Sequence, residues 1–187
     1  MNINKRKLAF YPVEEKHRGI ILDWFDKTHV KQWFYGEGLE NTRTKLHLFI
    51  NGIKNNGEYS FEHWIAYIDD QPFGFLMTSF VEGPYNPDDH INKWYEEGKK
   101  LITLDLLIGA EEYLGKGLGH QMIQEFLIEK FSHVDRVLID PSVSNTRAIH
   151  VYEKAGFRKV EQFPQQHDDP NPSWMMHLDM KELLEKG

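Results

Sequence analysis

Three glycines alternate with other residues in the segment Tyr113-Leu114-Gly115-Lys116-Gly117-Leu118-Gly119. The segment follows an apolar run at Leu101–Ile108 and precedes an apolar pattern with helical spacing. Because glycine has no Cβ, we expect the turn to leave backbone N–H groups free to point the same way, and not to serve packing. A helix that begins directly after such a turn attracts anions through its dipole and its unpaired amides. The segment therefore predicts a pyrophosphate-binding site.

The length of 187 residues is typical of one domain, and we expect residues 1–187 to form it. The chain has no cysteine, which excludes disulfides, thiolate metal sites and an acyl-cysteine intermediate. Residues 1–7 carry positive charge without an apolar core behind it, which is not the pattern of an export signal. No apolar run is long enough to span a bilayer. These features predict a cytoplasmic protein without a membrane partner.

The net charge of −7 argues against nucleic acid as a partner, since nucleic-acid-binding proteins usually present a basic face. An acidic surface favours cationic ligands by electrostatic steering, although it also serves solubility alone. The ten histidines show no metal-ligand spacing, so we expect no metal ion.

Hydrophobic periodicity predicts an α/β protein in which the glycine turn belongs to a βαβ unit. In that unit the strands 101–108 and 136–140 should be parallel, with the helix 118–131 between them. The insert 82–100 is polar and rich in turn formers, so it should be a lid or a binding loop. The remaining expected strands are 8–12, 61–68, 72–81, 157–163 and 174–180, and the remaining expected helices are 19–25, 42–53 and 145–155.

A glycine triplet by itself is compatible with a dinucleotide fingerprint, a kinase-type phosphate loop or a simple tight turn. A Walker motif is excluded, because no Gly-Lys-Ser/Thr sequence follows. A dinucleotide fold would place the glycines after its first strand, whereas here they lie beyond mid-chain.

A second pattern resolves this ambiguity. Asn145, Ala148, Tyr152, Gly156 and Phe157 form the sequence Asn-x-x-Ala-x-x-x-Tyr-x-x-x-Gly-Phe. With the glycine segment, it resembles the GNAT superfamily of acetyl-CoA-dependent N-acetyltransferases. Residues 101–157 resemble the aminoglycoside 6′-N-acetyltransferases in particular, and residues 23–36 and 64–81 are also similar to that group. The resemblance implies a GNAT fold, with a mixed central sheet flanked by helices and one βαβ unit that binds the cofactor.

The resemblance also implies a set of cofactor contacts. Leu114 departs from the family pattern, in which Arg or Gln is frequent at this position. The family holds phosphate mainly through backbone amides, so the departure leaves the prediction in place. The pyrophosphate should lie against the amides of the glycine loop, and Asn145 should help to position the pantetheine arm or the adenylate. The implied cofactor-binding residues are Leu107, Ile108, Lys116, Gly117, Leu118, Gly119, His120, Asn145 and Ala148.

Asp105 is the one carboxylate within the apolar run 101–108. Burial would raise its pKa and suit it to accept a proton near neutral pH. The resemblance places it beside the reacting amine as a base, while the alternative is a buried Asp held by backbone amides. The resemblance makes Tyr152 the general acid for the departing thiolate, while the alternative is a ring that only packs on the sheet.

Three further residues are candidates for substrate binding. Asp140 ends a strand at the carboxyl edge of the predicted sheet, where ligands of open α/β sheets bind. It could bind a second amine or act as a second base, or it could only cap the turn Asp140-Pro141-Ser142. Trp33 and Trp94 match aromatic positions of the aminoglycoside enzymes and suit stacking on an amine-bearing sugar, or they anchor core and loop.

The chain is therefore predicted to transfer acetyl from acetyl-CoA to a primary amine of a small polycation, such as the 6′-amine of an aminoglycoside. The absence of cysteine favours direct attack in a ternary complex. Siderophore or lysine N-acylation, protein N-acetylation and a non-catalytic acyl-CoA sensor are the alternatives. The sequence leaves the choice between monomer and homodimer open.

Overall fold

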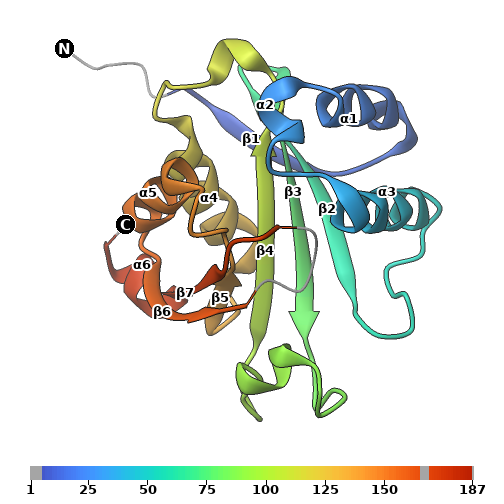
Figure 1. Cartoon of the computed structure of the whole chain (residues 1–187). Helices are drawn as coiled ribbons and strands as arrows, with labels where there is room; N and C mark the ends of the chain where they lie inside the picture. The colour runs from blue at the N-terminus through green and yellow to red at the C-terminus, as the bar shows by residue number, and fades with distance from the viewer. Residues whose placement is uncertain (1–5, 165–168, 187) are drawn as a thin grey trace.

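A seven-stranded mixed sheet forms the centre of the protein (Figure 1). The computed structural model describes residues 6–164 and 169–186, so residues 1–5 of the N-terminal segment discussed above lie outside it. The strand order is β1-β2-β3-β4-β5-β7-β6, and β4 and β5 are parallel while the other neighbours are antiparallel. The strands are β1 Leu8–Pro12, β2 Phe61–Ile68, β3 Gln71–Val81, β4 Leu101–Ile108, β5 Arg136–Ile139, β6 Arg158–Phe163 and β7 Ser173–Asp179.

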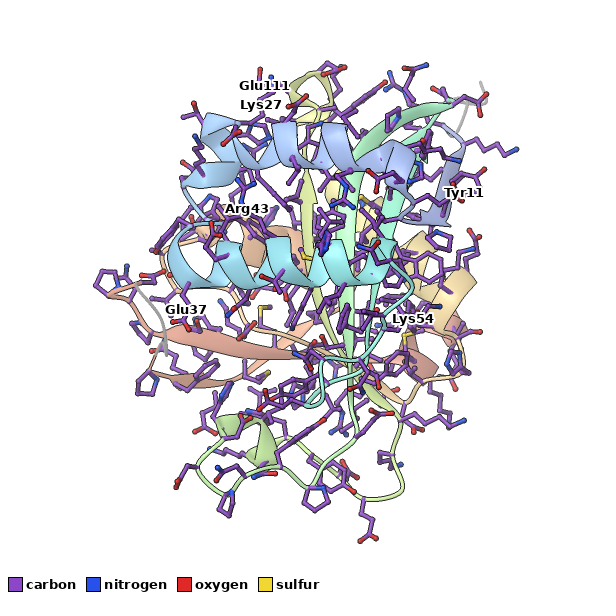
Figure 2. All side chains as sticks on the ribbon, turned by 90° about the vertical axis from the view of Figure 1, so that its right-hand side faces the viewer. Tyr11, Lys27, Glu37, Arg43, Lys54 and Glu111 are labelled. Atoms are coloured by element: carbon purple, nitrogen blue, oxygen red, sulfur yellow. The ribbon has the colours of Figure 1, made fainter. Side chains whose placement is uncertain are left out.

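Helices cover both faces of the sheet. One face carries α1 Arg18–Phe25, α2 Thr28–Lys31 and α3 Gly36–Ile50, and Figure 2 shows α1 and α3 side by side across it. The other face carries α4 Leu118–Phe131 and α5 Thr146–Ala155, with α6 Met180–Lys186 beside α4. Short 3₁₀ turns lie at η1 Glu15–His17, η2 His90–Lys93 and η3 Glu111–Tyr113. The mixed sheet between helices confirms the expected fold class.

Alternating side chains of the central strands enter two separate cores. Ile65, Phe75 and Leu107 pack with the helices α1 and α3, whereas Ala66 and Leu76 pack with α4 on the opposite face. This arrangement explains why β4 is apolar on both sides, since parallel and central strands are buried on both faces. The hairpin between β2 and β3 is also confirmed. Its two-residue turn is Asp69-Asp70, and both residues have positive φ, 47° and 64°, as the tight hairpin turn requires.

Strands β4 and β5 separate after a short paired stretch. Residues 101–103 of β4 pair with residues 136–138 of β5, but β4 continues to Ile108 along β3. Pro141, two residues after the end of β5, has no N–H with which to continue the ladder. The expected parallel βαβ unit is thus confirmed, although β5 ends one residue before Asp140. The separation leaves one edge of β4 unpaired where the chain approaches the glycine loop.

Several expected boundaries were wrong. The helix expected at 42–53 begins already at Gly36 and ends at Ile50, because its N-terminal half is polar and carries no apolar periodicity. Helix α2 has four residues, too few to show a period, and it was not predicted. The strand expected to reach Met180 ends at Asp179, because Met180 begins the unpredicted helix α6.

The insert 82–100 is attached to the sheet at several points. The Tyr59 hydroxyl donates to Asp89 Oδ2 at 2.6 Å, and Arg136 Nη1 lies 3.2 Å from Glu96 Oε2. The His90 ring stacks on Phe163 with centroids 4.9 Å apart. The segment is therefore held in place along the end of the sheet where β4 begins.

Gly109 allows α1 to dock on the end of β4. A Cβ on Gly109 would lie 2.0 Å from the ring of Trp24, a buried residue of α1. We expect Gly109→Ala to lower the free energy of unfolding by about 2–3 kcal/mol, because the indole has no room to retreat. The matched control is Gly19→Ala on α1, where nothing lies within 4 Å and alanine should stabilise by roughly 0.5–1 kcal/mol. Urea denaturation measures both, and equal midpoints for Gly109→Ala and the wild type would contradict the expectation.

Candidate active site

A cleft of about 670 Å³ opens where β4 and β5 separate. One wall comes from α2 and the start of α3, and the other comes from the glycine loop, the first turn of α4 and one side of α5. In Figure 1 these elements flank the upper half of β4 from both sides. The cleft thus brings together segments that are distant in sequence, and most of the expected site residues are among them.

The glycine loop forms one end of this cleft. Gly115 and Gly117 have φ of 71° and 73°, a left-handed conformation that a side chain would strain. Gly117 is the N-cap of α4, so the free amides of the first helical turn begin directly after it. Leu118 and His120 also line the cleft. Lys116 is not among the residues that line the cleft, and its Nζ lies 5.8 Å from the centre of the Tyr113 ring.

Gly119, an expected cofactor contact, also lines the cleft, and it has a packing role as well. A Cβ at this position would lie 2.8 Å from Cγ1 of Val151 on α5. Its φ is not in the left-handed region. The third glycine therefore lets α4 and α5 pack closely, and the expectation that none of the three serves packing was wrong for Gly119.

Helix α5 supplies the adjoining wall. Asn145 is its N-cap, and its side chain accepts a hydrogen bond of 3.2 Å from the Ala148 amide. Both residues line the cleft, as do three basic side chains that were not predicted as site residues: Arg147, His150 and Lys154. Their spacing of three and four residues places them along one side of a helix, and this spacing could have identified them. This end of the cleft is therefore basic.

The unpaired edge of β4 forms the floor. The Gly109 amide donates to Phe73 O on β3 at 2.9 Å. Because alternate residues of an antiparallel pair face the partner strand, Leu107 also turns its amide toward β3. Leu106 and Ile108 then turn theirs toward the separation from β5, where no strand pairs with them. Of the two expected cofactor contacts on β4, Ile108 thus presents its amide to the cleft, while the Leu107 amide faces β3.

Two carboxylates stand at the opposite end of the cleft. Asp105 comes from the floor of β4, and Asp140 comes from the residue after β5. Both side chains are accessible to water in the open cleft, although protein surrounds them on the other sides. Burial raises the pKa of Asp105, opposed by the charge of Lys45 on α3. Burial and the nearby Asp105 charge raise the pKa of Asp140 to about 7. Near neutral pH, this pair is therefore poised to exchange a proton.

The raised pKa of Asp140 implies a stability that depends on pH. The folded state binds the proton more tightly than the unfolded state, so stability is lost as pH rises from about 4 through about 7. Asp140→Asn removes this loss. We expect the variant to be more stable than the wild type at pH 8 by on the order of 1 kcal/mol, a value lowered for the water that reaches the side chain. At pH 4 the two should unfold at the same urea concentration, and a difference that does not change with pH would contradict this.

Tyr152 lies between the two ends on α5. The side chain is buried, lines the cleft and packs against Phe157 with ring centroids 6.0 Å apart. Burial and the charges of Asp105 and Asp140 raise the pKa of its hydroxyl. The phenol therefore keeps its proton at neutral pH and can donate it.

An aromatic wall faces the carboxylates. Trp33 and Tyr35, between α2 and α3, line the cleft and are 38% and 39% exposed, which leaves ring surface open to a ligand. The other expected aromatic, Trp94, is not among the residues that line the cleft. It packs edge-on against His177, with centroids 5.1 Å apart, beside a small core at the far end of the sheet. The contacts of Trp94 thus correspond to its alternative role as an anchor of the insert.

A third carboxylate, Asp169, also lines the cleft and was not predicted as a site residue. Its Oδ1 accepts from the Asn171 amide at 2.8 Å, and hydrogen bonds keep its pKa below the ordinary value. The cleft therefore has a basic end at α5 and an acidic end at Asp105, Asp140 and Asp169. Within the described ranges 6–164 and 169–186, no cluster of three His, Asp or Glu side chains suits a metal ion, and no helix is long and apolar enough to cross a membrane.

Comparisons with known proteins agree with this geometry. Residues 14–164 match the family described as "Acetyltransferase (GNAT) domain". The solved aminoglycoside N(6′)-acetyltransferase of Legionella pneumophila is 34% identical, with 100% of each chain covered and a TM-score of 0.83. The type 1 aminoglycoside N(6′)-acetyltransferase of Klebsiella pneumoniae is 27% identical over 78% of this chain and 71% of its own. A solved aminoglycoside acetyltransferase in complex with coenzyme A and kanamycin shares the fold at 21% identity, with 96% and 98% covered and a TM-score of 0.76.

Proposed function

The chain belongs to the GNAT acetyltransferase family, and we propose that it transfers the acetyl group of acetyl-CoA to the 6′-amine of an aminoglycoside. The observation that carries the proposal is the division of charge within one cleft, basic with free amides at one end and acidic with aromatic rings at the other. The relatives from Legionella pneumophila and Klebsiella pneumoniae, both named for this activity, support the choice of acceptor.

The basic end fits the phosphates of acetyl-CoA. The left-handed Gly115 and Gly117 orient the loop so that the first amides of α4 face the cleft, where a pyrophosphate would accept hydrogen bonds. Arg147 and Lys154 add positive charge on the adjoining wall. When bound, acetyl-CoA supplies an activated acetyl thioester.

The acidic end fits a polycationic acceptor. Asp105, Asp140 and Asp169 present carboxylates that can pair with several ammonium groups at once. The rings of Trp33 and Tyr35 offer faces for stacking and for cation–π contact. The net charge of −7 would draw such an acceptor toward the protein.

The residues between the two ends suit direct transfer. Asp105 takes a proton from the acceptor ammonium, and the neutral amine then forms the new C–N bond at the thioester carbonyl. The amides of Leu106 and Ile108, on the unpaired edge of β4, stabilise the oxygen that becomes negative. As the C–S bond breaks, the attacking nitrogen loses its second proton to water and Tyr152 gives its proton to the sulfur, and the phenol regains one from solvent.

The experiment is an assay of coenzyme A release with a panel of acceptors. Aminoglycosides with a 6′-amine should be acetylated, and analogues with a 6′-hydroxyl should not, with mass spectrometry to locate the new amide. Polyamines, hydroxylamines, lysine derivatives and peptide N-termini complete the panel. Faster turnover of one of these classes would assign that acceptor instead. Binding of acetyl-CoA without any turnover would overturn the enzymatic proposal in favour of an acyl-CoA sensor.

A further inference from the structure

His29 connects three segments around the cleft. It belongs to the short helix α2, and its Nε2 lies 2.9 Å from the carbonyl oxygen of Ile108 at the end of β4. Its Nδ1 lies 3.6 Å from Glu111 Oε1, in the turn η3 that leads into the glycine loop. Figure 2 shows Glu111 and Lys27, two residues before His29, at the same edge of the molecule. The ring therefore lies where the acceptor wall, the floor and the cosubstrate loop meet.

The direction of the hydrogen bond follows from its partner. A carbonyl oxygen only accepts, so Nε2 carries the hydrogen and donates it to Ile108. Nδ1 is buried and has no hydrogen-bond partner among the described residues. The one hydrogen bond that the ring makes among the described residues is thus the one that Nε2 donates to the Ile108 carbonyl.

The end of β4 is held on its other sides as well. The amides of Gly109 and Ala110 both donate to Phe73 O, at 2.9 Å and 3.3 Å, and Trp24 covers Gly109. These contacts leave open the edge of β4 that faces away from β3. His29 lies at this edge, on the carbonyl of Ile108, the residue whose own amide is one of the two proposed above to meet the thioester.

We infer that His29 is a positioning residue for acetyl transfer, which holds the unpaired end of β4 through the Ile108 carbonyl and so aligns the amides of Leu106 and Ile108 toward the acyl group. The inference rests on the proposed function. Loss of this bond would leave the Ile108 carbonyl without its partner and would loosen the unpaired edge of β4 beside the Ile108 amide. The loss should therefore lower kcat/KM for acetyl-CoA, while the carboxylates that meet the acceptor keep their positions.

The test compares His29→Gln with His29→Asn. The Gln amide nitrogen can reach the place of Nε2, whereas the Asn amide is one methylene too short. At saturating acceptor, we expect kcat/KM for acetyl-CoA to fall about tenfold in the Asn variant, because one carbonyl group loses its hydrogen bond. In the Gln variant, kcat/KM for acetyl-CoA should stay within about threefold of the wild-type value. The KM for the acceptor should change less than twofold in both. His133→Leu, an exposed histidine beyond α4, is the control and should match the wild type.

Equal kcat/KM for acetyl-CoA in folded Asn and Gln variants would overturn the inference, as would a folded Gln variant with the defect expected of Asn. Thermal unfolding establishes folding, and the Gln variant tests the inference even if the Asn variant does not fold. A wild-type protein that transfers no acetyl group would instead refute the proposed function. The two failures are therefore distinguishable.

Discussion

We expect Asp105→Asn to lower kcat/KM for the acceptor about 10²- to 10³-fold. The affinity for coenzyme A should stay within about twofold of the wild-type value. The substitution keeps the shape of the side chain but removes its ability to accept a proton. Asp105 lies at the acidic end of the cleft, away from the glycine loop, so the contacts that hold the cosubstrate remain. Steady-state kinetics and calorimetry with coenzyme A measure the two quantities.

The pH dependence gives a second readout for the same variant. In the wild type, kcat/KM should fall as pH drops, because burial raises the pKa of Asp105 and a protonated Asp105 can no longer accept a proton. The Asn variant should lose this dependence. Asp23→Asn, on the exposed side of α1, is the control and should keep both the rate and the pH profile.

The Asp140→Asn variant tests which of the two carboxylates acts as the base. If Asp105 is the base, the Asp140 variant should mainly raise the acceptor KM, because one of the carboxylates that can pair with the acceptor is lost. A folded Asp105→Asn protein with more than a third of the wild-type turnover would contradict the assignment. A collapse of turnover in the Asp140 variant instead would move the role of base to Asp140.

The strands and the glycine loop of the cleft were predictable because their signals are local. Alternation or continuous apolar character marked β2, β3 and β4, and a strand–glycine–helix sequence marked the glycine loop. The left-handed conformation of Gly115 and Gly117 is a property of glycine itself. The role of Gly119 was not visible in the same way, because it depends on Val151, a residue of another helix.

The acidic end of the cleft was harder to predict, because it is assembled from separate segments. Asp105 was identified as a carboxylate in an apolar run, but its proximity to Asp140 depends on how far β4 and β5 remain paired. Asp169 lies in a stretch of sequence without hydrophobic periodicity, and helix α2 with His29 is shorter than two helical turns. The contacts of Trp94 were not predictable from its match to an aromatic position of the aminoglycoside enzymes, since the His177 ring that it packs against lies on the distant strand β7.

Tyr152→Phe is expected to lower kcat about 10²-fold, with both KM values changed less than about threefold. Phenylalanine keeps the ring that packs against Phe157, so the substitution separates the hydroxyl from the packing. Because burial and the neighbouring carboxylates raise the pKa of this hydroxyl, it stays protonated throughout the working pH range. The variant should therefore show the same fractional loss of kcat from pH 6 to pH 9.

Two controls accompany the Tyr152→Phe measurement. Tyr11→Phe, on the exposed side of the edge strand β1, should keep the wild-type kcat. Thermal unfolding of Tyr152→Phe should match that of the wild type, since the buried ring is retained. A kcat within threefold of the wild-type value would leave the tyrosine with its packing role alone. The departing thiolate would then take its proton from another donor, such as water.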